Sequence, residues 1–179
     1  PCPLLLIVPR HPQRFDDVAA LIAASGLTAV RRSTWADAPP PEAARADVWL
    51  GDSIGEMATY YSCAQVALLG GSFEPLGGQN LIEAAACGCP VLMGPHTYNF
   101  ADAAAMALRE GAAMRVDDME MAVRVAVKML MPKIAEGDNT SNRLDPRAPS
   151  ADCTLAFAAR HRGAAQRMAL QIDRLKASA

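Results

Sequence analysis

The sequence predicts an α/β protein built on a doubly wound parallel sheet. Short, continuously apolar runs such as Leu4–Val8 recur along the chain and are typical of strands that are buried on both faces. They alternate with segments in which apolar residues follow the helical repeat and a glycine such as Gly26 or Gly111 comes after the last turn. With 51% hydrophobic and 20% charged residues, the 179-residue chain can bury a core.

The strands are predicted from apolar runs that are bounded by glycine, proline or polar residues. LLLIV is the first of them, and VWL and VLM are central to two others. In chain order the predicted strands are 4–8, 27–33, 47–52, 65–71, 90–95 and 112–116.

The helices are predicted from helical spacing together with start and stop signals. Ser53 and Glu56 have the spacing of a capping box, and Asn80 is a good N-cap with Glu83 in the reciprocal position. Asn99 with Asp102 is expected to cap the helix that Gly111 closes. The predicted helices are 14–26, 53–64, 80–87, 101–111, 118–130 and 153–177.

Residues 1–179 are expected to form one domain, in which the polar stretch 133–152 is an exposed loop and 153–177 is a C-terminal helix. The chain begins at Pro1 without a methionine and runs at once into an apolar strand. We therefore expect it to be part of a longer polypeptide. No segment has the length of a signal peptide or a membrane span.

Composition argues against several functions. A net charge of −2, a pI near 5.9 and an aromatic content of only 5% argue against a nucleic-acid-binding surface. The five cysteines show no ligand cluster, so we expect small buried thiols in a reducing compartment and no metal site. Neither a Gly-Lys-Ser/Thr phosphate loop nor a GxGxxG fingerprint after the first strand is present, which argues against a nicotinamide cofactor.

Ligands of doubly wound sheets bind beyond the carboxyl ends of the strands. Arg10 follows the first predicted strand, where it could hold a phosphate or carboxylate, or pair with a nearby aspartate. Gly55 interrupts the start of a helix, either for a local turn or for close approach of a flat ligand. The Gly77–Gly78 pair leads into Asn80, whose turn could bind an anion while Glu83 accepts hydrogen bonds from sugar hydroxyls.

These segments, taken in order, resemble the C-terminal half of 3-deoxy-D-manno-octulosonic acid (Kdo) transferases. The similar segments are IVPRHPQRF, RRS, LGDSIGEM, GGSFEPLGGQNLIEAA and GCPVLMGPHTYNFAD, with RGAAQRMALQI near the end. The resemblance implies a Rossmann-like donor domain of a GT-B glycosyltransferase that binds CMP-Kdo. By similarity the CMP contacts are Pro9, Arg10, Ile54, Gly55, Glu56, Asn80, Leu81, Ile82 and Glu83.

The same resemblance implies an inverting transfer of Kdo to a lipid A precursor in lipopolysaccharide biosynthesis, without a metal or another cofactor. The general base, the acceptor site and a membrane anchor are expected in an N-terminal domain, so no catalytic residue is assigned here. The location implied is the cytoplasmic face of the bacterial inner membrane, with this part soluble. The chain departs from the family pattern at Ile54, Gln79 and Leu81, where Met, His and Pro are common.

Two alternatives stay open from the residues themselves. One is another GT-B glycosyltransferase, or a sugar-nucleotide epimerase, that uses a UDP donor. The other is a non-catalytic domain, either one that binds a nucleotide or a binding or scaffolding domain in which the glycines only shape turns.

Overall fold

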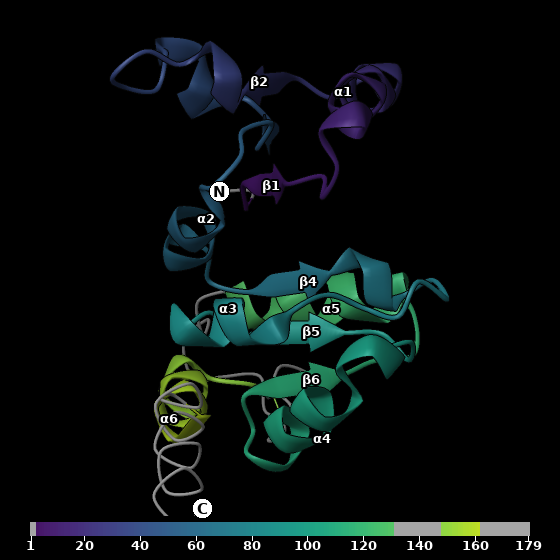
Figure 1. Cartoon of the computed structure of the whole chain (residues 1–179). Helices are drawn as coiled ribbons and strands as arrows, with labels where there is room; N and C mark the ends of the chain where they lie inside the picture. The colour runs from purple at the N-terminus through teal and green to yellow at the C-terminus, as the bar shows by residue number, and fades with distance from the viewer. Residues whose placement is uncertain (1–2, 131–147, 162–179) are drawn as a thin grey trace, which may run out of the picture. The chain divides into compact units, whose positions relative to one another are not determined.

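A computed structural model describes residues 3–130 and 148–161 (Figure 1). The chain divides into two compact units, Pro1–Tyr60 and Tyr61–Ala179. Each unit contains a three-stranded parallel sheet, so the predicted parallel α/β architecture is confirmed and its strands belong to two sheets. Within the described residues, no helix is both long enough and apolar enough to cross a bilayer.

The sheet of the first unit has the strand order β1-β3-β2. Ile7, Arg31 and Leu50 are aligned across it, so the segments that follow its strands leave from one edge. Val48 and Leu50 of the central strand are fully buried and pack with Ile22. The elements are β1 (Leu5–Ile7), α1 (Phe15–Ala24), β2 (Ala29–Arg31), β3 (Val48–Leu50) and α2 (Met57–Cys63), with 3-10 turns at Pro12–Arg14, Arg32–Thr34 and Pro41–Arg45.

The second unit holds the larger core, around a sheet of order β4-β5-β6. Its central strand is an apolar run that is buried throughout, and α3 packs against α6, where Phe157 is buried. The elements are β4 (Ala67–Leu69), α3 (Leu81–Ala86), β5 (Val91–Met93), α4 (Ala101–Arg109), β6 (Ala113–Arg115), α5 (Met119–Leu130) and α6 (Ala151–His161), with 3-10 turns at Gly70–Ser72 and Tyr98–Phe100.

All six predicted strands are present and are shorter than predicted. Helix boundaries also differ from the predicted ones, and two of the differences are informative. The helix predicted from Ser53 begins at Met57, because Gly55 has a positive φ of 86° that no helix accommodates. The last helix begins at Ala151, inside the stretch predicted as a loop. The rest of that predicted loop up to residue 147, and the predicted helix beyond His161, lie outside the described residues.

Cys63, Cys89 and Cys153 are free thiols; the predicted burial holds for Cys89 and is wrong for Cys63, which is exposed. Cys89 is buried in the core of the second unit, and burial raises the pKa of its thiol to about 11. It is therefore protonated at neutral pH and packs as a small apolar side chain.

Candidate functional site

The loop after β1 carries Arg10, an exposed arginine. The two aspartates that were its possible partners are engaged elsewhere: Asp16 pairs with Arg31 at 2.7 Å and Asp17 with Arg14 at 3.5 Å. Among the described residues, no ion pair involves Arg10. Its guanidinium is thus available for an anionic ligand, the first of the two alternatives that the sequence left open.

The turn after β3, Ile54–Glu56, is shaped by its glycine. Gly55 has a φ of 86°, and a Cβ atom added there would meet nothing within 4 Å. Glycine is therefore required here by the backbone conformation. Crowding by neighbouring protein atoms is not the reason. Ile54 beside it is 81% exposed and Gly55 is exposed too, so the turn presents an apolar side chain and the backbone of its glycine to solvent.

The carboxylate of Glu56 points back into the protein. It accepts hydrogen bonds from Arg32 at 2.6 Å, from the Tyr60 hydroxyl at 3.1 Å and from the Ser53 hydroxyl. The bond from Ser53, followed by those from Tyr60 and Arg32, lowers the pKa of Glu56 against the raising effect of burial. The predicted capping box is therefore wrong in detail, because Ser53 bonds the side chain of Glu56. Arg32, directly after β2, bonds the same carboxylate and ties this turn to the end of β2.

Asp52, also at the end of β3, joins the ends of β2 and β3. Its fully buried carboxylate accepts hydrogen bonds from Arg31 Nε at 2.6 Å and from the Ser33 amide at 2.8 Å and hydroxyl at 2.6 Å. Burial raises the pKa of Asp52, but the bonds from Ser33 and Arg31 outweigh it and leave the pKa lowered. Asp52 thereby fixes the edge from which the Ile54–Glu56 turn leaves.

This arrangement predicts an acid-sensitive first unit. Because the pKa of Asp52 is lower when folded, its contribution to stability is present above its unfolded pKa of about 3.9 and is lost as pH falls through the folded value. We expect Asp52→Asn to lose roughly 1.5–3 kcal/mol at pH 7, typical of hydrogen bonds to a charged group. Below about pH 4 the loss should shrink.

Urea unfolding at a series of pH values, followed by tryptophan fluorescence, measures this effect. Both tryptophans of the chain, Trp35 and Trp49, lie in the first unit and report on it directly. Asp37→Asn, at an exposed aspartate of the same unit, is the control. A penalty at Asp52 that stays constant down to pH 2 would contradict the prediction.

In the second unit, Asn80 caps α3 as predicted. Its side-chain oxygen accepts a hydrogen bond from the Ile82 amide at 3.1 Å, and its Nδ2 donates to Glu83 Oε1 at 2.9 Å. Glu83 therefore supports the cap through the side chain of Asn80, where a backbone contact was expected. Ile82 and Glu83 are exposed, whereas Leu81 is only 1% exposed and packs in the core, so a ligand could reach Leu81 only through its backbone.

The Gly77–Gly78 pair lies against the protein's own next loop. Both glycines have positive φ, of 85° and 83°, and a Cβ atom on Gly77 would come within 2.2 Å of Asn99 Nδ2 and 2.7 Å of Tyr98. The side-chain Nδ2 of Asn99 donates to the Leu76 carbonyl at 3.3 Å, and the backbone N–H of Asn99 donates to the Gly77 carbonyl at 3.1 Å. Asn99 thus locks two loops together, and its predicted role in capping α4 is wrong.

Buried Ser72 joins the ends of β4 and β5. Its hydroxyl donates to the Leu69 carbonyl at 2.5 Å and accepts from the Gly94 amide at 2.7 Å. The Ser72 carbonyl also accepts from the His96 amide at 2.9 Å. The loops after these two strands are therefore held at fixed spacing next to the Asn80 turn.

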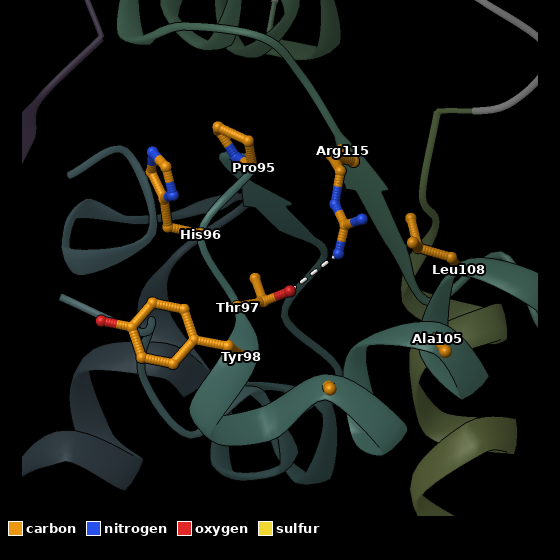
Figure 2. Close-up of a pocket in the computed structure, with 8 residues that line it drawn as sticks. Pro95, His96, Thr97, Tyr98, Ala105, Leu108 and Arg115 are labelled. Carbon is orange, nitrogen blue, oxygen red and sulfur yellow. Dashed lines mark hydrogen bonds between the residues drawn. The ribbon is translucent and has the colours of Figure 1, made fainter. Parts of the chain in front are cut away.

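A pocket of about 310 Å³ is lined in part by the loop that follows β5 (Figure 2). Its lining residues come from that loop, from α4 and from the end of β6, all within the second unit: Pro95, His96, Thr97, Tyr98, Ala101, Ala105, Leu108 and Arg115. Arg115 donates to the Thr97 hydroxyl at 2.7 Å. No sequence pattern had predicted this pocket.

The predicted site residues are thus distributed over both units. Pro9–Arg10 and Ile54–Glu56 follow the adjacent strands β1 and β3 of the first unit, and Asn80–Glu83 begins α3 of the second. Sequence reasoning did not assign roles to several residues that hold these loops: Arg31, Arg32, Ser33, Asp52, Tyr60, Ser72 and Arg115. A usable signal was present for two of them, because Arg31 and Asp52 end strands that were expected to share one edge.

Comparison with known proteins identifies relatives. No protein-family model matches the chain. A 3-deoxy-D-manno-octulosonic acid transferase of Bordetella pertussis is 54% identical over 130 residues, which are 73% of this chain and 30% of that protein. The protein of the same name from Haemophilus influenzae is 38% identical over 128 residues, 72% of this chain and 29% of that protein. The chain thus matches less than a third of either relative's length.

Among solved structures, the C-terminal CMP-Kdo binding domain of WaaA from Acinetobacter baumannii has the same fold. The TM-score is 0.65 at 32% sequence identity, covering 71% of this chain and 64% of that one. The resemblance seen in the sequence motifs is therefore confirmed independently by overall sequence similarity and by structure. By both criteria, this chain is a homologue of the 3-deoxy-D-manno-octulosonic acid transferases.

Proposed function

We propose that this chain is the donor-binding part of a Kdo transferase and binds the CMP moiety of CMP-Kdo. The observation that carries the proposal is the structural match, at 32% identity, to a domain described as CMP-Kdo binding. The 54% identity to a Kdo transferase supports it from the sequence. In this view the chain is the C-terminal, Rossmann-like half of a GT-B enzyme.

The proposed contacts follow from the chemistry of each loop. In the first unit, Arg10 binds the phosphate, because a guanidinium without an acidic partner among the described residues pairs readily with an anion. The exposed turn Ile54–Glu56 lies against the cytosine through its backbone and Ile54. In the second unit, Glu83 uses the oxygen that Asn80 leaves free to accept from the ribose hydroxyls.

The reaction proposed is an inverting displacement at the anomeric carbon of Kdo. A hydroxyl oxygen of the lipid A precursor forms a bond to that carbon while the bond to the CMP phosphate oxygen breaks and the hydroxyl proton passes to a general base. Arg10 stabilises the charge that develops on departing CMP, without a metal or cofactor. The base, the acceptor site and attachment to the inner membrane belong, in this proposal, to the rest of the enzyme, so this chain alone should bind donor without transferring Kdo.

A thermal-shift comparison of CMP, UMP and UDP tests the proposal. A ligand at ~100 times its dissociation constant stabilises a protein by about 2.7 kcal/mol, so CMP should raise the melting temperature measurably. UMP and UDP should raise it less at equal concentration, because the turn around Gly55 would be fitted to cytosine. Stabilisation by UDP above CMP would favour a UDP-dependent glycosyltransferase or epimerase. No shift with any nucleotide would favour a scaffolding domain in which the glycines only shape turns, and would contradict the proposal.

A further inference from the structure

The pocket beside β6 has the charge pattern of a site for a small anion. Arg115 is the one formally charged residue among those that line it, and no carboxylate contributes to its wall. Within the described part of the chain, no ion pair involves Arg115. An incoming anion would therefore meet a cation whose charge is not already neutralised by a neighbour.

The guanidinium of Arg115 is held in place before any ligand arrives. One of its Nη2 hydrogens is donated to the Thr97 hydroxyl oxygen at 2.7 Å, and Thr97 itself is 7% exposed (Figure 2). That contact uses only part of the donor fork of the arginine, and it leaves the hydroxyl hydrogen of Thr97 free to donate in turn. A carboxylate could accept from both groups at once.

The rest of the pocket suits a compact molecule. Ala101, Ala105 and Leu108 recur at helical spacing along α4 and form a wall of small and apolar side chains. A volume of about 310 Å³ lies at the lower end of the range of ligand pockets, roughly 300–1,000 Å³. It fits one monosaccharide and is too small for a whole nucleotide sugar.

The pocket shares a wall with the loop next to the proposed nucleotide contacts. A Cβ atom on Gly78 would be 3.2 Å from the His96 carbonyl oxygen and 3.3 Å from Thr97 Cα. Gly78 is two residues before Asn80, the cap of α3. The strand order β4-β5-β6 likewise places the loop after β5 between the Asn80 turn and Arg115.

We propose that this pocket holds the acid sugar of the donor, with the Kdo carboxylate on Arg115 and Thr97. This inference rests on the proposed function. It adds a sugar subsite to the nucleotide contacts and assigns it residues that the sequence resemblance does not mark. Recognition of an octulosonic acid requires a receptor for its carboxylate, and Arg115 is the lining residue that can supply it.

Titration of the ¹⁵N-labelled chain with free Kdo, followed by nuclear magnetic resonance, tests the proposal at millimolar affinities. We expect amide shifts at Thr97 and Arg115 with Kdo, and none with mannose, which has no carboxylate. Arg115→Gln should weaken Kdo binding by about tenfold or more, since it removes a charged hydrogen-bonding group. Arg115→Lys should weaken it less, because the charge remains although the fork is lost.

Arg109→Gln is the matched control, an exposed arginine of α4 that does not line the pocket. Absence of Kdo-dependent shifts, equal shifts with mannose, or unchanged Kdo binding in Arg115→Gln would overturn the sugar subsite. CMP titrated into the same samples separates the two proposals. If CMP binds equally to the parent and to Arg115→Gln while Kdo causes no shift, the nucleotide proposal stands and the sugar subsite fails. If CMP itself does not bind, the proposed function fails.

Discussion

Gly94→Ala should destabilise the second unit by about 3 kcal/mol, at the upper end for overpacking a buried position. Gly94 is buried directly after β5, and an added Cβ atom would lie 2.4 Å from the Ser72 carbonyl oxygen and 2.9 Å from Phe73 Cα. These are backbone atoms that no rotamer change can move. Relief of the clash would also stretch the hydrogen bond from the Gly94 amide to the Ser72 hydroxyl, which measures 2.7 Å.

Gly70→Ala is the matched control within the same unit. A Cβ atom at Gly70 would meet nothing within 4 Å, so this substitution should change stability by less than about 0.5 kcal/mol. Urea unfolding followed by circular dichroism measures both variants. Equal midpoints for the two would show that the loops after β4 and β5 are not held at the spacing described here.

Arg10→Ala and Glu83→Ala should each weaken CMP binding by about 1–3 kcal/mol, or roughly 5- to 150-fold, the cost of losing one charged hydrogen-bonding group. Arg10 has no acidic partner among the described residues, so its removal should not disturb the fold. Glu83 accepts from Asn80 at 2.9 Å, so its removal also loosens the cap of α3. Isothermal titration calorimetry with CMP measures the affinities.

Conservative variants and controls separate binding from folding. Glu83→Gln keeps an oxygen that can accept from Asn80 but loses the charge, so it should bind CMP weakly while melting like the parent. Arg14→Ala and Glu120→Ala change exposed members of surface ion pairs and should leave CMP affinity unchanged. Parent-like CMP affinity in both Arg10→Ala and Glu83→Ala would show that the site assignment is wrong.

The elements of this protein were predictable because their signals are local. The apolar run around Val91 predicts a buried strand wherever the chain takes it, and Asn80 predicts a helix start because its side chain reaches an amide two residues away. Side-chain contacts other than the expected caps formed at Ser53, within its own turn, and at Asn99, with a loop more than twenty residues away. Both residues fit ordinary caps in sequence, but Ser53 bonds the Glu56 carboxylate and Asn99 bonds the loop of Leu76.

The sequence by itself determined that this is a parallel α/β protein and a relative of Kdo transferases, since strand patterns and ordered motifs can be read along the chain. Only the tertiary structure decided that the Gly77–Gly78 pair makes room for the loop of Tyr98 and Asn99. It also decided which side chains anchor each strand end. It also revealed the Arg115 pocket. Contacts such as Arg31 to Asp52 and Arg115 to Thr97 join residues that are 21 and 18 positions apart. Their partners are chosen by the folded sheet, and no local pattern specifies them.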